Sequence, residues 1–236
     1  MSTESRKIAD LFKGKFLASP SQIAQKLPAI KAFVFDWDGV FNDGQKDQDG
    51  SSSFSEIDAM GTNLLRFNHY LRTGIPPRVA VFSGEQNKAA FRLAGREHFD
   101  AVYYKLSDKI RALHHFCRWH ELEPSEVAFF FDDVLDFSLA ALCGLRIMVS
   151  RDCNPLLRDF AENRRLADYI TFADGGNHAV RESVELLTGL SGKYSETIEH
   201  RMHYAPLYQQ YLALRNRPKP LFYTLIDSEI TEQTPI

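Results

Sequence analysis

The feature of this sequence that most constrains its fold is a pair of short apolar runs that each end in aspartates. They are Ala32-Phe33-Val34-Phe35 before Asp36 and Asp38, and Val127-Ala128-Phe129-Phe130-Phe131 before Asp132 and Asp133. Runs of this length, rich in β-branched and aromatic residues, are typical of strands that are buried on both faces of a parallel sheet. Because ligands bind at the carboxyl ends of such strands, both acidic pairs are expected to face one crevice.

Four carboxylates in one crevice need a compensating charge. Two carboxylates about 4 Å apart repel each other by roughly 4 kcal/mol at an effective dielectric constant of about 20. Such a cluster therefore binds a cation or shifts its pKa values. Oxygen ligands suit Mg²⁺, which accepts few protein carboxylates and keeps water and substrate oxygens in its shell. The sequence predicts a magnesium site.

The order of the strand and helix signals predicts an α/β fold. The strands are expected at residues 32–36, 78–82, 101–104, 127–131 and 145–149, and the helices at about 58–71, 85–94, 107–120, 134–142 and 179–187. Such alternation requires right-handed crossovers, a mostly parallel sheet and helices on both faces. We therefore expect a three-layer, Rossmann-like architecture.

The segment after the first strand contains two Asp-Gly dipeptides, at residues 43–44 and 49–50. Dipeptides of this kind favour tight turns, so a small β-hairpin flap is expected beside the end of the first strand. No inserted segment is long enough to form a large cap domain.

The chain of 236 residues fits one large domain with additions at both ends. We expect an N-terminal helical extension over residues 1–30, the main domain over 31–190 and a C-terminal helical tail over 191–236. In the tail, Tyr204, Tyr208 and Tyr211 recur at helical spacing. A subunit contact is the favoured role for these tyrosines, over packing within the chain.

Composition excludes several classes of protein. A net charge of −3 does not favour a nucleic-acid or acidic-membrane surface. The longest nearly apolar stretch, residues 138–149, is too short to cross a bilayer, and residues 1–13 lack the apolar core of a signal peptide. The three cysteines form no CxxC pair. We expect a cytoplasmic protein without a nucleic-acid or membrane partner.

Four short motifs occur in order along the main domain. They are Asp36-Trp37-Asp38-Gly39-Val40, Ser83-Gly84, Lys109 at the start of a helix, and Asp132-Asp133-Val134-Leu135-Asp136. Together they resemble the motifs of the haloacid dehalogenase (HAD) phosphatase superfamily. The resemblance implies a HAD fold, a phosphatase domain over residues 31–190, and an enzyme that hydrolyses phosphoric monoesters.

The resemblance also implies a role for each matching residue. Asp36 would attack phosphorus and form an aspartyl-phosphate, and Asp38 would protonate the leaving alkoxide and then activate water. A covalent intermediate of this kind divides one difficult displacement into two easier ones. Ser83, Gly84 and Lys109 would hold the phosphoryl group, and Lys105 is the competing choice for the lysine.

The metal and its support are implied in the same way. Mg²⁺ would be held by Asp36, by the backbone carbonyl of Asp38 and by Asp132, while Asp133 would orient Lys109 or metal-bound water. An N-cap of the following helix is the alternative role for Asp136. In the family's pattern a glycine stands where this chain has Phe131, whose large side chain could crowd the pocket.

Within the superfamily, the chain resembles the small, capless group that contains 3-deoxy-D-manno-octulosonate 8-phosphate (KDO 8-phosphate) phosphatase. The segments that carry this likeness are residues 38–44, Asp168-Tyr169-Ile170-Thr171 and residues 175–182. The likeness implies a small phosphorylated sugar acid or another nonulosonate phosphate as substrate. It also implies a homotetramer in which a neighbour closes the site.

Two departures from that group bear on the substrate. Glu85 stands where an arginine usually follows the second motif, and residues 57–62 lack the arginine of the usual segment. A less acidic sugar phosphate is therefore an alternative. His178 replaces a glycine and is expected to be a surface or helix-capping residue, with a place in the pocket as the alternative. The alternatives for function are a phosphotransferase or mutase, and a non-catalytic assembly or binding module.

Overall fold

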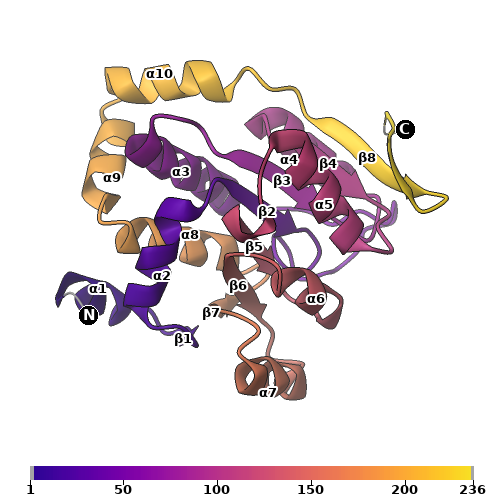
Figure 1. Ribbon diagram of the computed structural model, residues 1–236, viewed down its shortest axis with the longest axis horizontal. Coiled ribbons are helices and arrows are strands. Elements are labelled where there is room, and N and C mark those ends of the chain that lie inside the picture. The colour runs from indigo at the N-terminus through magenta and orange to yellow at the C-terminus, as the bar shows by residue number, and fades with distance from the viewer. Residues whose placement is uncertain (1–2, 235–236) are drawn as a thin grey trace.

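The computed structural model describes residues 3–234, which form a mixed α/β fold around one twisted sheet (Figure 1). The strands within this range are β1 (Lys15–Phe16), β2 (Ala32–Asp36), β3 (Arg78–Phe82), β4 (Ala101–Tyr104), β5 (Val127–Phe131), β6 (Leu145–Ser150), β7 (Tyr169–Asp174), β8 (Leu221–Ile226) and β9 (Glu229–Glu232). Their order in the sheet is β1-β7-β6-β5-β2-β3-β4-β8-β9. The strands from β7 to β8 pair in parallel, and only the edge strands β1 and β9 pair antiparallel.

Helices cover both faces of the sheet. They are α1 (Thr3–Ala9), α2 (Pro20–Lys26), α3 (Glu56–Thr73), α4 (Lys88–Glu97), α5 (Lys109–His120), α6 (Phe137–Ala140), α7 (Pro155–Arg164), α8 (Ala179–Leu190), α9 (Tyr194–Met202) and α10 (Pro206–Arg215), with short 3₁₀ turns η1 (Leu27–Ala29), η2 (Pro124–Glu126) and η3 (Val134–Asp136). Residues of α2, α3, α4 and α8 share one apolar core with the sheet, and residues of α5, α6 and α7 share the other. The predicted three-layer architecture is confirmed.

Strand β2 shows why the sheet needs two covering layers. All five of its residues are buried, with Phe33 and Phe35 in one core and Ala32 and Val34 in the other. Successive side chains of a strand point to opposite faces, so an unbroken apolar run has to be covered on both sides.

The topology fixes where a ligand crevice can form. The chain runs outward from β2 through β3 to β4, and then returns to β5 on the other side of β2. The direction of winding therefore reverses between β2 and β5, and ligands bind at the carboxyl ends of strands at such a switch point. Phe35 pairs with Phe130 in this register, so the residues that follow the two strands emerge side by side.

The predicted flap is not a β-hairpin. No residue from 42 to 55 forms a strand. The Asp-Gly turns are present, because Gly44 and Gly50 have φ angles of 82° and 73°. Asp47 Oδ1 accepts hydrogen bonds from the backbone N–H groups of Asp49 and Ser51. These side-chain contacts occupy backbone donors that a hairpin ladder would use, and the segment is an ordered loop.

Both terminal additions extend the sheet. The N-terminal extension contributes β1, which pairs with β7. The tail contains the predicted helical part as α9 and α10, but it continues into β8 and β9, so the expectation of a purely helical tail is wrong. Strand β8 has the sequence Leu-Phe-Tyr-Thr-Leu-Ile, which is rich in β-forming residues. It covers the open edge of β4 and so removes an exposed pairing edge.

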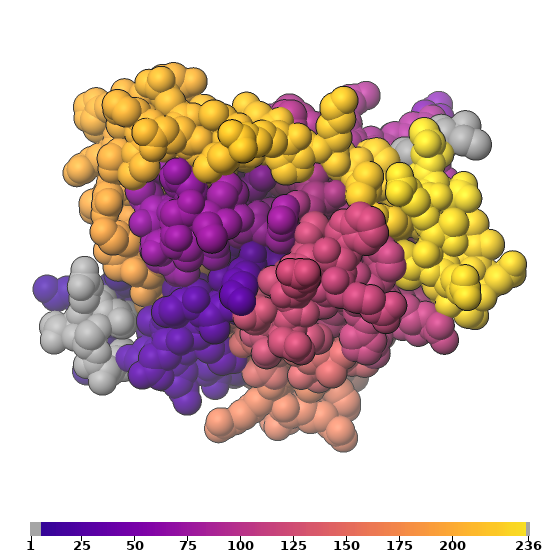
Figure 2. Space-filling view, turned by 45° about the horizontal axis from the view of Figure 1, so that its top comes forward, coloured from indigo at the N-terminus to yellow at the C-terminus, as the bar shows by residue number. Residues whose placement is uncertain are grey.

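The tail tyrosines pack mainly within the chain. Tyr208 and Tyr211 are buried against Phe67 and Tyr70 of α3, and Tyr211 Oη donates to Asn63 Oδ1 at 3.0 Å. Tyr204 alone of the three remains exposed. The expected subunit contact is therefore wrong for Tyr208 and Tyr211. Figure 2 shows the orange and yellow surface of the tail lying along the purple surface of the chain that includes α3.

Candidate active site

A cavity of about 520 Å³ opens at the carboxyl ends of β2 and β5. Its lining includes the acidic residues Asp36, Asp38, Asp132 and Asp133, and also Gly84, Glu85, Lys109, Asp136 and Arg151. All four motifs thus line one cavity. Three of them do so through charged side chains, and the second does so through Gly84. The crevice expected from the two apolar runs is present.

Three buried carboxylates lie at the base of this cavity. Asp36 ends β2, Asp132 follows β5, and Asp136 ends the 3₁₀ turn η3. One oxygen from each carboxylate lies within 4.8 Å of the others. Asp132 and Asp136 are each only 1% exposed. Sequence reasoning assigned Asp136 to a helix cap as the alternative, so its place in this cluster is a finding of the structure.

Lys109 neutralises part of the cluster. It is the first residue of α5, and its Nζ lies 2.9 Å from Asp36 Oδ1 and 2.6 Å from Asp136 Oδ1. Burial lowers the pKa of Lys109, but the charges of Asp36 and Asp136 outweigh this effect and raise it above its usual value. Lys109 therefore stays a cation at neutral pH. The competing Lys105 is exposed and lies outside the residues that line this cavity.

The three carboxylates fit a hard divalent cation. Asp132 Oδ2 and Asp136 Oδ2 are buried and have no hydrogen-bond partner among the described residues. Buried carboxylate oxygens that accept no hydrogen bond are costly, and an ion coordinated by them would reduce that cost. An all-oxygen ligand set suits Mg²⁺ or Ca²⁺ rather than a soft metal. The predicted ligation by the carbonyl of Asp38 stays a prediction.

Asp132 and Asp136 hold their protons more tightly than free carboxylates do. Burial and the charge of Asp36 raise the pKa of Asp132 to about 8, against the opposing charge of Arg151. Burial and Asp36 likewise raise the pKa of Asp136 to about 7, against the opposing charge of Lys109. Because both folded-state pKa values lie above the unfolded values, the metal-free site favours folding at low pH. That contribution is lost as the pH rises from about 4 to about 8.

Asp132→Asn should therefore stabilise the metal-free protein more strongly at pH 8 than at pH 5. The variant lacks a carboxylate that must ionise while buried, so its advantage in free energy of unfolding should grow by up to about 1.4 kcal/mol per pH unit. Urea unfolding in EDTA at several pH values measures this difference. An advantage that is the same at pH 5 and pH 8 would contradict the raised pKa.

Asp38 lines the same cavity but belongs to a different hydrogen-bond network. Its Oδ1 accepts a hydrogen bond from Ser52 Oγ at 2.5 Å and lies 2.6 Å from Lys46 Nζ. Both partners come from the loop that was predicted to be a flap. The side chain of Asp38 is 26% exposed, so it is more exposed to solvent than the buried Asp36, Asp132 and Asp136, which line the same cavity.

The second motif forms one wall of the cavity. Gly84 and Glu85 line it, whereas Ser83 lies behind them and is 1% exposed. Ser83 Oγ accepts a hydrogen bond from the backbone N–H of Glu85 at 3.2 Å. A direct contact of Ser83 with phosphate stays a prediction, and the structure adds the exposed Glu85 to the rim of the cavity.

The last motif differs from expectation in two ways. Asp133 is exposed and caps η3 by accepting a hydrogen bond from Val134 N at 2.7 Å. Asp136 contacts Lys109 instead, because the turn η3 carries the motif's third aspartate back into the cavity. Phe131 does not crowd the site. It is fully buried, its ring is stacked on Phe129 at 5.4 Å, and it packs in the core on one face of the sheet.

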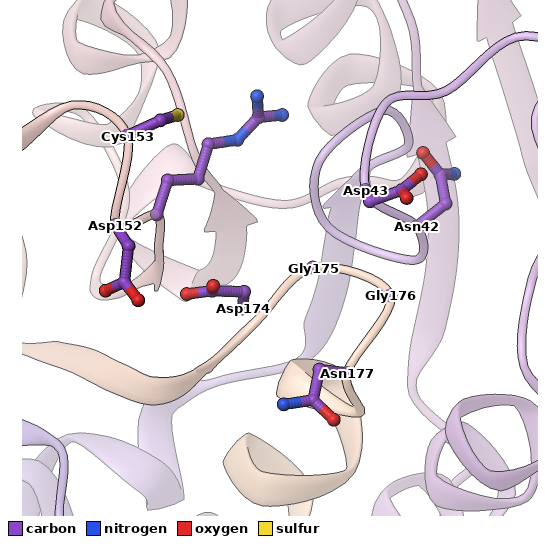
Figure 3. Close-up of a pocket in the computed structure, with 9 residues that line it drawn as sticks. Asn42, Asp43, Asp152, Cys153, Asp174, Gly175, Gly176 and Asn177 are labelled. Carbon is purple, nitrogen blue, oxygen red and sulfur yellow. The ribbon is translucent and has the colours of Figure 1, made fainter.

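Arg151, which sequence reasoning missed, joins this cavity to a second one of about 460 Å³. Its Nη2 lies 2.5 Å from Asp132 Oδ2, an ion pair without hydrogen-bond geometry. The second cavity is lined by Arg151 together with Asn42, Asp43, Asp152, Cys153, Asp174, Gly175, Gly176 and Asn177 (Figure 3). Arg151 directly follows β6, and β6 lies next to β5 in the sheet. A charged residue at the carboxyl end of this strand is the signal that could have identified it.

Gly39 allows this arrangement. Its φ is 84°, and a Cβ at this position would lie 1.8 Å from Arg151 Nη2 and 2.1 Å from Asp132 Oδ2. Only glycine combines this backbone conformation with so close an approach. The glycine of the first motif is therefore required by the carboxylate cluster itself.

His178 lies at the start of α8 and is not among the residues that line either cavity. Its Nδ1 is 3.2 Å from Ser55 Oγ and 3.7 Å from Asp58 Oδ2, next to the first turn of α3. It occupies the N-cap position of α8 but makes no side-chain capping hydrogen bond. His178 is therefore a partly exposed packing residue between two helices.

Comparison with known proteins agrees with this geometry. No family model matches the chain. The chain is 29% identical over 173 residues to the 3-deoxy-D-manno-octulosonate 8-phosphate phosphatase KdsC of Yersinia pestis, covering 70% of this chain and 83% of that protein. It is 28% identical over 187 residues to KdsC of Escherichia coli K12, covering 75% and 88%.

Solved structures give the same result. The 3-deoxy-D-manno-octulosonate 8-phosphate phosphatase of Moraxella catarrhalis, in complex with magnesium, phosphate and KDO, matches with a TM-score of 0.63 and 28% identity, over 77% of this chain and 98% of that one. The cobalt-bound phosphatase of Haemophilus influenzae matches with a TM-score of 0.59 and 26% identity, over 72% and 94%. The described residues contain no helix long and apolar enough to cross a membrane.

Proposed function

We propose that this chain, which resembles the KDO 8-phosphate phosphatases of the HAD type, hydrolyses the phosphate monoester of a small sugar in a magnesium-dependent reaction. The observation that carries the proposal is the cavity at the switch point of the sheet, in which the carboxylates of Asp36, Asp132 and Asp136 cluster and Lys109 contacts Asp36 and Asp136. Buried carboxylates whose oxygens accept no hydrogen bond, placed beside a nucleophile, suit phosphoryl transfer, which depends on positioning and charge.

Magnesium fits this set of residues. Asp36, Asp132 and the backbone carbonyl of Asp38 would hold it, and Asp136 offers a further oxygen. When bound, the ion neutralises the carboxylates and supplies positive charge for the phosphoryl oxygens. Its presence in the Moraxella catarrhalis phosphatase supports this assignment.

The residues of the chain would carry out two displacements. In the first, an oxygen of Asp36 attacks phosphorus, the bond from phosphorus to the sugar oxygen breaks, and Asp38 gives its proton to the leaving alkoxide. In the second, Asp38 takes a proton from water as the water oxygen attacks the aspartyl-phosphate, which releases phosphate and restores Asp36. Lys109, Ser83 and the backbone of Gly84 would hold the phosphoryl oxygens throughout.

The finer assignment is a phosphorylated sugar acid related to KDO 8-phosphate. The names of the relatives support it. Glu85 weighs against a strongly acidic sugar, because a carboxylate on the cavity rim repels a second one. We therefore place other nonulosonate phosphates and less acidic sugar phosphates in the same substrate class. A cytoplasmic location and a homotetramer in which a neighbour covers the cavity complete the proposal.

Phosphate release from a panel of sugar phosphates and sugar-acid phosphates tests the proposal. We expect turnover that requires Mg²⁺, stops in EDTA and yields one inorganic phosphate for each dephosphorylated sugar. Transfer of the phosphoryl group to a second sugar without phosphate release would instead support a phosphotransferase or mutase. Absence of turnover with every member of the panel, in the presence of Mg²⁺, would contradict the proposal.

A further inference from the structure

We propose that Ser52 is a positioning residue that fixes Asp38 Oδ1 as a hydrogen-bond acceptor, so that Asp38 Oδ2 carries the proton transferred to the leaving group. The inference rests on the proposed function, because it assigns the proton of the general acid to one atom. It follows from a hydrogen-bond network that links the buried Asn87, Trp37 and Ser52 to the partly exposed Asp38.

The network is anchored by Asn87, whose amide orientation is determined by the backbone. Asn87 is fully buried and caps α4. Its Oδ1 accepts a hydrogen bond from the backbone N–H of Ala89 at 3.1 Å, a group that can only donate. Ser51 Oγ donates to the same oxygen at 2.8 Å. The other end of the amide, Nδ2, must therefore face Ser52, and it donates to Ser52 Oγ at 2.6 Å.

Trp37 supplies the second donor to Ser52. Its indole Nε1 lies 3.1 Å from Ser52 Oγ, and an indole N–H can only donate. A serine hydroxyl has two acceptor positions and one proton. With both acceptor positions of Ser52 occupied by N–H donors, its own proton is left for Asp38 Oδ1, which lies 2.5 Å away.

Asp38 Oδ1 thus receives a donor whose direction is fixed by buried groups. Lys46 Nζ lies 2.6 Å from the same oxygen and is also a donor without an acceptor lone pair. A proton on Oδ1 would clash with both donors, so the protonated form of Asp38 carries its proton on Oδ2. Asp38 lines the cavity, and Oδ2 is the oxygen left for the leaving group. Ser52 acts through Asp38 and does not touch the substrate.

The dependence of activity on the leaving group tests the inference. A sugar alkoxide leaves only with a proton, whereas 2,4-dinitrophenolate leaves without one. The ratio kcat/KM reports steps up to departure of the leaving group. We expect Ser52→Ala to lower kcat/KM about 10- to 100-fold for a sugar phosphate, a part of the 10²–10⁴-fold that general acids supply. For 2,4-dinitrophenyl phosphate we expect a change of less than about threefold.

Matched variants separate positioning from folding. Ser53→Ala, at an exposed neighbouring serine, should leave both substrates unaffected, and Ser52→Thr should restore the lost activity. Lys46→Met removes the other donor to Asp38 Oδ1. Because Lys46 is exposed, this change leaves the hydrogen bonds among Asn87, Trp37 and Ser52 in place. It should give the same selective loss even if Ser52→Ala folds poorly.

Equal losses of kcat/KM for both substrates in Ser52→Ala and Lys46→Met would overturn the inference and leave Ser52 a structural role only. Unchanged values in both variants would overturn it as well. Either result leaves the proposed function intact as long as the wild-type protein hydrolyses both esters. A wild-type protein that hydrolyses neither ester overturns the proposed function together with this inference.

Discussion

Asp36→Asn should abolish phosphate release, with a fall in kcat of at least about 10⁴-fold, the scale of loss seen when a nucleophile is removed. The amide cannot form the aspartyl-phosphate, although Asp38, Lys109 and the remaining carboxylates stay in place around it. Phosphate release in the presence of Mg²⁺ measures the effect. Mass spectrometry of acid-quenched protein should detect a phosphorylated Asp36 peptide in the wild type alone.

The stability of Asp36→Asn distinguishes lost chemistry from lost folding. Asp36 raises the pKa of both Asp132 and Asp136, so its neutralisation relieves repulsion between buried carboxylates. The variant should therefore keep the wild-type Tm in EDTA or exceed it. Asp49→Asn, which removes a carboxylate that is 72% exposed, is the charge-matched control and should keep full activity. Turnover by Asp36→Asn close to that of the wild type would contradict its role as nucleophile.

Lys109→Met should lower both activity and stability. The side chain is 11% exposed and lies within 3 Å of two carboxylates. Removal of one partner from a buried ionic cluster costs about 3 kcal/mol, and loss of one donor to the transferring group lowers kcat by roughly 10²–10³-fold. Urea unfolding and steady-state kinetics measure the two effects.

The control for this prediction is Lys105→Met. Lys105 is an exposed residue outside the described lining of the cavity, and its loss should change neither quantity. Mg²⁺ should restore part of the stability of Lys109→Met, because the ion supplies some of the missing positive charge. If Lys109→Met were as stable and as active as Lys105→Met, the assigned role of Lys109 would be excluded.

The strands, the first motif and the position of Asp132 could be predicted because they depend on local patterns. An apolar run with acidic residues at its end predicts both a buried strand and the position of its carboxyl end. The strands 78–82, 101–104 and 127–131 occur at the expected residues. The side-by-side placement of Asp36 and Asp132 then follows from the parallel register of β2 and β5.

The missed residues depend on paths that no local pattern determines. Asp136 enters the cluster because η3 turns the chain back toward β2, and Arg151 enters because β6 lies next to β5. Ser52 contacts Asp38 because the loop after β2 folds over the strand ends instead of forming a hairpin. Tyr208 and Tyr211 have the spacing of a docking face, but the partner that they contact is α3 of the same chain.

The location of a bound divalent ion tests the central claim most directly. In crystals grown with Mn²⁺ in place of Mg²⁺, anomalous scattering should show one ion among the carboxylates of Asp36, Asp132 and Asp136. Crystals of Asp132→Asn grown under the same conditions should show a much weaker anomalous peak at this position. An ion bound elsewhere, or a peak at the cluster that is unchanged in Asp132→Asn, would contradict a magnesium-dependent site built from the ends of β2 and β5.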